Sequence, residues 1–409
     1  MIGDMYLAWS SDEETLKKGE YGGVVTTLLK FALENKIVDA VLTVKKMDGN
    51  RYDGVLTLIT NPEEVIECAG ALHCAPLNIA RALKEYLDGS KDMRIAVTCK
   101  PCDARAIIEL VKREQINIEN LVLIGLNCTG TLLPRVARRM FEEIYRVNPD
   151  DVVREDIDEG KLIIELRDGT RKEKDLDSLE EAGYGRRENC RRCEISIPRM
   201  ADLACGKWGT MGKKATFIEV CTEKGSQLLD EAIKAGYLQV ETPTREALDE
   251  RSRKEKEALD RSKKWQEKNF NELKGLNYEE RLNYWFNHFD RCIKCFSCRD
   301  ACPICYCVEC RLEVDRNFIP GGELPPDKLF HLTRLAHVGD SCVNCGQCQD
   351  ACPMEIPISK LFHMLNKELS PLFEYVPGRA ADQLPPLTVV TDEELRVDEP
   401  YLFLKKEST

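Results

Sequence analysis

The chain has 409 residues, 20 cysteines and a formal net charge of −12 at pH 7. The length suggests two or three domains, and the negative charge argues against binding to nucleic acid or to an anionic membrane surface. The first residues lack the basic start and apolar run of a signal peptide, and no stretch approaches the roughly 18 apolar residues of a membrane span. We therefore expect a cytoplasmic protein whose clustered cysteines bind metal or carry redox chemistry instead of forming disulfides.

Strand-like and helical segments alternate over residues 1–240. Helical periodicity marks residues 24–36. Short apolar runs predict strands at residues 37–45, 93–98 and 121–126. Residues 161–174 alternate around an Asp-Gly turn and predict a hairpin. We expect an α/β domain with a mixed sheet, mostly parallel with antiparallel additions, and ligands beyond the carboxyl ends of its strands.

Two glycines, Gly22 and Gly23, stand directly before the first predicted helix. Glycine lets the backbone approach a ligand, and a helix start offers free amides, so a phosphate group fits there. A plain turn explains the same pair of glycines. The sequence has no G-x-G-x-x-G after its first strand, so a conventional dinucleotide-binding site is not indicated.

Four cysteines from three segments form a possible ligand set in this domain. Cys102 and Cys128 follow two of the apolar runs, and Cys190 and Cys193 make a C-x2-C pair. Both an iron–sulfur cluster and a zinc ion accept four thiolates, so spacing alone leaves the two open.

Residues 241–285 are dense in both charge signs and almost free of glycine and proline. We interpret them as a solvated helical linker supported by weak pairs four residues apart. Residues 376–409 contain a proline-rich stretch and a charged end. We interpret them as an extended tail that docks on a partner.

Residues 286–375 contain two cysteine runs with the spacing C-x2-C-x2-C-x3-C-P. The first run is Cys292, Cys295, Cys298 and Cys302, and the second run is Cys342, Cys345, Cys348 and Cys352. This is the pattern of bacterial ferredoxins with two [4Fe–4S] clusters, in which the fourth cysteine of each run serves the other cluster. We therefore assign Cys352 to the cluster of the first run and Cys302 to that of the second. Structural zinc usually takes two separated pairs of ligands, which fits these runs poorly.

Three more cysteines, Cys305, Cys307 and Cys310, continue the first run as C-x-C-x2-C. They fit a further cluster that takes its fourth ligand from elsewhere, and they fit buried thiols beside the first cluster equally well. The sequence leaves both interpretations open.

Four stretches carry a family resemblance: YGGVVTTLLKFALENKIVDAV, KPCDARAI, GLNCTG and NCRRCEISIPRMADLACGKWG. Together they resemble the flavin-binding beta subunit of coenzyme F420-dependent hydrogenases and dehydrogenases. With the two cysteine runs added, the chain is most similar to the formate dehydrogenase branch of that family, as found in methanogens. The resemblance extends to about residue 375.

The resemblance implies one FAD and one [4Fe–4S] cluster in the α/β domain. It implies that the cluster ligands are Cys102, Cys128, Cys190 and Cys193. It implies that Gly22, Gly23, Thr26 and Thr27 lie near FAD, that His73 approaches the flavin or the coenzyme, and that Asp202, Gly206 and Trp208 lie near the cluster and flavin. By charge, Lys100 and Arg105 suit the anionic groups of the coenzyme or of FAD. The plainer alternatives are a hydrogen-bonded loop histidine and two solvated cations.

The resemblance implies an oxidoreductase subunit that passes electrons from three or four [4Fe–4S] clusters through FAD to coenzyme F420 as hydride, reversibly. Formate would be oxidised on a separate molybdenum- or tungsten-dependent alpha subunit, and heterodisulfide reductase-type subunits are further possible partners. No catalytic acid or base is expected in this chain. Two alternatives stay open. The same scaffold can serve another acceptor, such as NAD or a heterodisulfide reductase partner, or the chain can be an electron wire without a diffusible substrate.

Overall fold

The computed structural model of the chain describes residues 1–47, 50–308, 310, 312 and 328–388. Most of the predicted tail, residues 389–409, lies outside the described residues. Within the described part of the chain, no helix has the length and apolar character needed to cross a membrane.

The main sheet has eight strands in the order β11-β1-β10-β9-β5-β4-β2-β3. β2, β4, β5 and β9 run parallel, and the remaining neighbours pair antiparallel. The mixed α/β sheet expected from the sequence is therefore confirmed, but the expectation that it is mostly parallel is wrong, because three of its seven neighbouring strand pairs are parallel and four are antiparallel. The strands are β1 Met5–Ser10, β2 Ala40–Met47, β3 Asn50–Ile59, β4 Ile95–Cys99, β5 Leu121–Leu126, β9 Leu203–Gly206, β10 Thr216–Val220 and β11 Leu238–Glu241.

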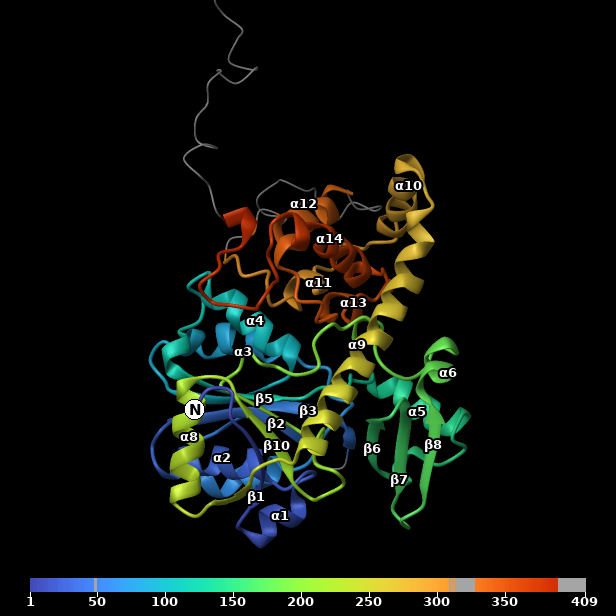
Figure 1. Cartoon of the computed structure of the whole chain (residues 1–409). Helices are drawn as coiled ribbons and strands as arrows, with labels where there is room; N and C mark the ends of the chain where they lie inside the picture. The colour runs from blue at the N-terminus through green and yellow to red at the C-terminus, as the bar shows by residue number, and fades with distance from the viewer. Residues whose placement is uncertain (48–49, 309, 311, 313–327, 389–409) are drawn as a thin grey trace, which may run out of the picture.

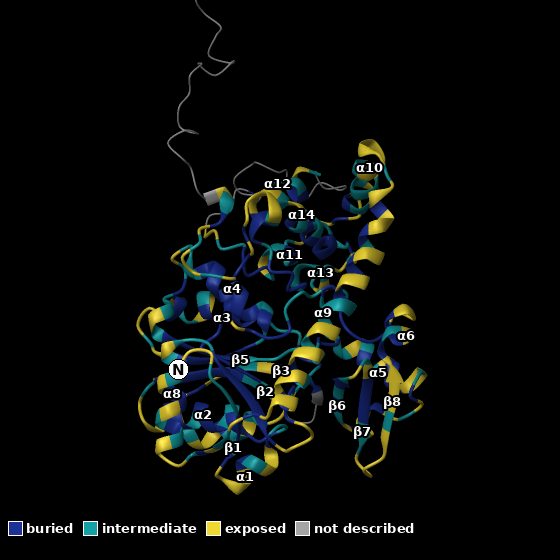
Figure 2. Cartoon of the chain, in the orientation of Figure 1, coloured by how far each residue is buried: buried dark blue, intermediate teal, exposed yellow. Residues whose placement is uncertain are grey.

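Helices cover both faces of the main sheet, which explains why β4 is buried along its whole length (Figures 1 and 2). Ile95 and Val97 of β4 pack with α3 and α4 on one face, whereas Ala96 packs with α2 and α8 on the other. Alternate residues of a strand point to opposite faces, so a strand between two helical layers needs apolar residues throughout. The covering helices are α2 Val24–Glu34, α3 Ile79–Tyr86, α4 Pro101–Val111 and α8 Glu223–Lys234.

A second sheet of three antiparallel strands in the order β6-β7-β8 stands beside the main one (Figure 1). The predicted hairpin forms its β7 and β8, where Glu165 pairs with Arg171 across the turn. Phe141 and Tyr145 pack under this sheet with Leu162 and Ile164. Its elements are β6 Val152–Asp158, β7 Lys161–Leu166, β8 Arg171–Asp175, α5 Pro134–Glu143 and α6 Leu176–Glu181.

The charged segment forms α9, Arg245–Lys274, and α10, Tyr278–Phe289. α9 has 30 residues, which corresponds to about 45 Å of helix. It runs from the side of the main sheet to the C-terminal helices (Figure 1). Trp265, Phe270 and Leu273 of α9 are buried, so the expectation of a wholly solvated linker is wrong along its second half.

The C-terminal helices lie above α3 and α4 and share one hydrophobic core with them (Figure 1). They are α11 Ser297–Asp300, α12 Leu329–Val338, α13 Gln347–Asp350 and α14 Ile358–Leu372. The short helices α1 Glu13–Lys18 and α7 Glu188–Arg191 and the 3-10 turns Pro62–Cys68, Asp88–Ser90, Ile118–Asn120, Pro149–Asp151, Gly339–Ser341 and Pro386–Thr388 complete the described helical elements.

A buried ion cluster ties the segment after α14 to α4. The Glu109 carboxylate accepts hydrogen bonds from Lys112 Nζ and Arg113 Nη1, both at 2.8 Å, from Tyr375 Oη at 2.5 Å and from the Gly378 amide at 2.6 Å. The Glu109 and Lys112 side chains have no exposed surface. Because an unpaired buried charge is costly, this cluster holds the C-terminal segment in one place against α4.

Candidate redox site

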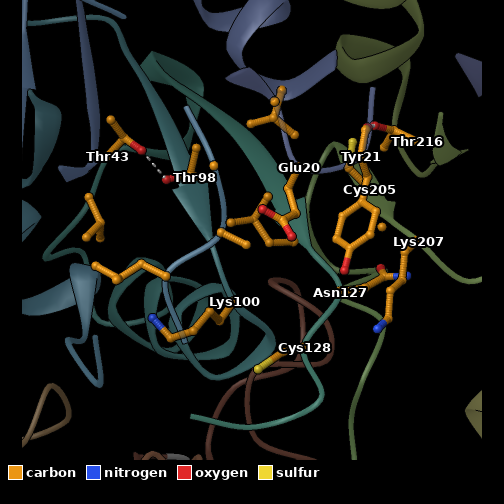
Figure 3. A pocket seen from close by; sticks show the side chains of 18 of the residues that line it. Glu20, Tyr21, Thr43, Thr98, Lys100, Asn127, Cys128, Cys205, Lys207 and Thr216 are labelled. Carbon is orange, nitrogen blue, oxygen red and sulfur yellow. Dashed lines mark hydrogen bonds between the residues drawn. The ribbon is translucent and has the colours of Figure 1, made fainter. Parts of the chain in front are cut away.

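A cavity of about 270 Å³ opens at the carboxyl ends of β4, β5 and β9 (Figure 3). We call it the apolar cavity, because Val24, Val25, Leu29, Val44, Val65, Leu72 and Ile79 contribute its apolar wall. Thr98 and Lys100 reach it from the end of β4, and Asn127 and Cys128 from the end of β5. This is where open α/β sheets bind their ligands, because the loops after parallel strands meet at one edge.

One side of the apolar cavity carries a buried polar network. Tyr21 Oη donates to Asp156 Oδ2 at 2.9 Å, and Lys207 Nζ donates to Asp156 Oδ1 at 2.6 Å. Burial alone raises the pKa of Asp156, but the attraction of Lys207 outweighs it and holds that pKa below its usual value. Burial, followed by the charge of Asp156, raises the pKa of Tyr21. At neutral pH the network therefore presents a carboxylate, a phenol and an ammonium group to the cavity.

Asn127 has an unusual position in this wall. Its Oδ1 and Nδ2 are both buried without a hydrogen-bond partner, and it lines the cavity (Figure 3). A Cβ on Gly206 would lie 2.4 Å from Asn127 Nδ2, so only glycine fits beside it. Leaving a buried amide unsatisfied costs about 1–3 kcal/mol per group. A planar ligand with a donor and an acceptor on one edge would satisfy both atoms, so the wall suits a heteroaromatic ring.

The predicted flavin-binding residues divide into two groups. Six of them line the apolar cavity, namely Gly23, Thr26, His73, Lys100, Gly206 and Trp208. Lys100 Nζ donates to the Leu77 carbonyl at 2.9 Å and forms an ion pair with Asp103 at 2.7 Å, so it is no solvated cation.

The other four predicted residues do not line this cavity. Arg105 Nε donates to the Pro377 carbonyl at 2.6 Å, toward the C-terminal segment. Asp202 accepts from the Leu123 amide at 2.7 Å and from Thr222 Oγ1, which joins β5 to the start of α8. Thr27 Oγ1 donates to Ser10 Oγ at 2.8 Å, and Gly22 packs against Ala215. The structure thus gives all four a structural explanation, and the predicted ligand contact of Arg105 and Asp202 is not supported.

A second cavity, of about 80 Å³, lies beside the first and is lined by the four cysteines Cys102, Cys128, Cys190 and Cys193. We call it the cysteine cavity. Cys102 comes from the first turn of α4, Cys128 follows β5, and Cys190 lies in α7. Cys128 and Lys100 line both cavities. The sequence segments that predicted a ligand set therefore meet, and their role as ligands stays a prediction.

The two cysteine runs are interleaved. Cys292, Cys295 and Cys298 line one small cavity together with Cys352 of the second run, which is the exchange that the ferredoxin pattern predicts. The half-buried Cys342 lies near the buried Cys345 beside α13. Cys302 and Cys348 both lie close enough to Arg334 to favour its charged form. Ligation itself stays a prediction for both runs.

The cysteine cavity adjoins the second run directly. Arg187 Nη2 donates to the Cys345 carbonyl at 2.9 Å and forms an ion pair with Asp350. Asn189 Nδ2 donates to the Asn344 carbonyl and Asn344 Nδ2 donates to the Asn189 carbonyl, each at 3.1 Å. The apolar cavity, the cysteine cavity and the two runs therefore form one contiguous series through the molecule.

A cubane cluster binds one thiolate at each of its four corners, so its cysteines ring a volume instead of meeting at a point. Among the residues that the structure describes, no three His, Cys, Asp or Glu side chains are grouped so as to hold a single metal ion.

Several residues of the site could not be predicted from the sequence. Asn127 and Lys207 stand next to or near predicted residues in GLNCTG and ADLACGKWG, yet a lone amide or lysine gives no signal of its own. Tyr21 and Asp156 meet only because the second sheet folds back beside the first, a contact between residues 135 apart in the chain.

The cavity at the strand ends and the grouped cysteines are features of an α/β redox protein. Residues 5–84 match the family model for the N-terminal part of the coenzyme F420 hydrogenase/dehydrogenase beta subunit, and residues 92–246 match the model for its C-terminal part. The chain belongs to this family of oxidoreductase subunits.

Several relatives extend the match. The chain is 47% identical to the F420-dependent formate dehydrogenase subunit beta of Methanocaldococcus jannaschii, over 93% of this chain and 98% of that protein. It is 46% identical to the F420-dependent formate dehydrogenase 1 subunit beta of Methanococcus maripaludis, over 94% of this chain and 98% of that protein. The coenzyme F420 hydrogenase subunit beta of Methanococcus voltae is 26% identical over 57% of this chain and 81% of its own length.

Among solved structures, a chain of the F420-reducing [NiFe] hydrogenase complex from Methanosarcina barkeri shares the fold. Its TM-score is 0.58 at 19% identity, and the match covers 68% of this chain and 96% of that one. At this identity the likeness concerns the fold alone.

Proposed function

We propose that the chain is the electron-transfer subunit of a formate dehydrogenase-type complex that exchanges electrons with coenzyme F420. Electrons enter at the two cysteine runs, cross to the cysteine cavity, and leave from the apolar cavity as hydride to F420. The series has no preferred direction, so the reverse flow is equally available. The near full-length relatives named F420-dependent formate dehydrogenase subunit beta support this proposal.

The observation that carries the proposal is that Cys128 lines both the apolar cavity and the cysteine cavity. A ligand of the iron–sulfur site therefore forms part of the wall of the proposed flavin site. One backbone segment at the end of β5 holds the two sites together, because Asn127 and Cys128 are consecutive. Electron transfer between two bound groups requires this kind of fixed, close placement.

The residues of the apolar cavity fit FAD. The free amide of Asn127 suits the edge of the flavin ring, and the apolar wall excludes water from its face. Lys207 and Lys100 bring positive charge next to a group that gains electrons. FAD would supply the step between single electrons and a hydride pair, which iron–sulfur clusters cannot make alone. Lys100 and Lys207, with Thr26 and Trp208, would orient it.

Twelve cysteines would hold three [4Fe–4S] clusters. Four line the cysteine cavity and eight belong to the two runs. Cys295 of the first run is exposed, and the exposed Ile293 lies next to it. We place the contact with the electron-donating alpha subunit, a molybdenum or tungsten enzyme, at this surface. The cytoplasm is the expected compartment.

Iron, flavin and acceptor measurements on anaerobically purified protein test the proposal. Three clusters require at least about twelve irons per chain, and we expect one FAD and reduction of F420 by a low-potential donor. If the protein contains FAD but reduces only NAD, the assignment of F420 as the acceptor is wrong. A chain that lacks FAD and does not take it up would be an electron wire, which would overturn the proposal.

A further inference from the structure

A third group of thiols lies outside the sites described above. Cys305, Cys307 and Cys310 line a cavity of about 730 Å³ between the C-terminal helices and α3. We call it the outer cavity. Five basic side chains line it together with three carboxylates: Arg81, Lys84, Arg113, Arg299 and Arg334, and Glu85, Asp300 and Asp340. The outer cavity thus combines three thiols with an excess of positive charge.

The surroundings of Arg334 are a second observation, independent of the cavity lining, that points to an anionic group beside these thiols. Its side chain is buried, with 2% of the residue exposed. Its Nη1 donates to Cys298 Sγ at 3.1 Å, and its Nη2 lies 3.7 Å from Cys305 Sγ. Within the described residues Arg334 has no carboxylate partner, and its Nε is unsatisfied. A buried guanidinium requires compensating negative charge.

Among the described residues, the sulfur atoms of Cys298 and Cys305 are the groups that can compensate the charge of Arg334. Cys298 belongs to the first run, where ligation makes its sulfur a thiolate. The same guanidinium faces Cys305 in the same way, although Cys305 belongs to neither run. Cys305 therefore has the same cationic neighbour as Cys298, a predicted cluster ligand. Cys305 also contacts Cys302.

The local chain suits ligation as well. The three thiols lie within six residues, and residues 305–307 form neither helix nor strand, so the backbone can wrap a corner of a cluster. The Lys84 ammonium lies close to both Cys305 and Cys307. Tyr306 lies between these two thiols in the chain and packs under Arg113, whose guanidinium carbon is 5.7 Å from the ring centre. Cations on several sides suit an anionic metal–sulfur group.

We propose that Cys305, Cys307 and Cys310 bind an additional iron–sulfur cluster in the outer cavity. Three cysteines leave one corner of a four-iron cluster to a non-cysteine ligand such as water. The cluster adjoins the first run through Arg334, which contacts sulfur on both sides. The inference rests on the proposed function only in that the other three clusters set the baseline iron count.

The test is iron, acid-labile sulfide and zinc per chain in the anaerobically purified full-length protein. Four clusters correspond to about sixteen irons, and the triple variant Cys305→Ser/Cys307→Ser/Cys310→Ser is expected to lose a quarter of the iron. The matched control is Cys221→Ser, a half-buried cysteine that lines none of the cavities described here, and it should lose none.

A second variant covers the case in which the triple variant does not fold. Cys307 is exposed, so Cys307→Ala removes a ligand without opening a core cavity. It should also lose about a quarter of the iron while the flavin content stays the same. Electron paramagnetic resonance of the reduced protein should lose one cluster signal and keep the rest.

Three results would overturn the proposal. They are a wild-type protein with about twelve irons, variants with unchanged iron, and a loss of zinc in place of iron. The proposed function is judged separately: a protein with about sixteen irons that fails to reduce F420 would refute that function and leave the additional cluster standing.

Discussion

The substitution Glu109→Gln tests whether the buried ion cluster on α4 holds the C-terminal segment. Glutamine keeps the shape of the side chain but removes the charge that Lys112 and Arg113 share. Lys112 would keep neutral acceptors, the amide oxygen of the glutamine and the Tyr375 hydroxyl at 2.9 Å, but its side chain has no exposed surface and would lose its carboxylate partner. Removing one partner of a buried ion pair costs about 3–5 kcal/mol, which corresponds to about a hundredfold or greater shift in a local opening equilibrium.

The loss of stability should be confined to the attachment of the C-terminal segment, because the other contacts of α4 remain. The Gly378 amide donates to Glu109 at 2.6 Å, so its hydrogen exchange reports directly on the attachment. We expect this amide to exchange at least about a hundredfold faster in Glu109→Gln. Glu119→Gln, at an exposed position, is the control and should change exchange little. A change at Gly378 of less than threefold would refute the reasoning.

The same cluster predicts a pH dependence. Burial raises the pKa of Glu109, but Lys112, Tyr375 and Arg113 together lower it below the usual 4.5. A group whose pKa is depressed by folding contributes stability above its unfolded pKa and loses it as the pH falls through the folded pKa. Release of residues 373–388 is therefore expected below about pH 4.5 in the wild type. In Glu109→Gln the release should not depend on pH in that range.

Three further predictions concern the redox site. Asn127→Leu should weaken FAD binding about 10- to 100-fold, measured by flavin titration, because two amide hydrogen bonds are lost. Asp156→Asn should lower the pKa of Tyr21 in an ultraviolet pH titration, because the carboxylate beside the phenol loses its charge; an unchanged pKa would contradict the network. Cys190→Ser should lose about four irons and keep its FAD, and equal iron in both proteins would exclude Cys190 as a ligand.

Much of the fold could be predicted from the sequence, because burial produces a clear pattern of apolar residues in strands and helices. β4 and β5 are mostly apolar because helices cover both faces of the sheet, and the helical period of α2 shows in VVTTLLKFALE. β6, with the sequence VVREDID, was missed because its charged residues pair with residues far away in the chain, Arg154 with Glu20 and Asp156 with Lys207. Local patterns record burial, and they do not record long-range ion pairs.

The parts of the site that could be predicted are those in which the spacing of cysteines indicates a particular kind of ligand. The two cysteine runs follow from fixed intervals, so their prediction needs no knowledge of the fold. The set in the cysteine cavity comes from three distant segments, and its prediction depended on the family resemblance. Arg105 was assigned by its charge and Asp202 by the family resemblance, but their side chains bond to the Pro377 carbonyl and the Leu123 amide. The direction of a side chain depends on the packing of distant segments, which the sequence does not display.

The reciprocal pairing of Asn189 with Asn344 has a consequence for the placement of the second run. Next to α7, the junction between the α/β part and the second run includes paired amides and one ion pair, Arg187 with Asp350, beside the hydrophobic core that the C-terminal helices share with α3 and α4. Polar junctions of this kind are specific in register yet tolerate exposure to water. The pairing beside α7 therefore sets one position for the second run on the α/β part, through contacts that water can reach without breaking them.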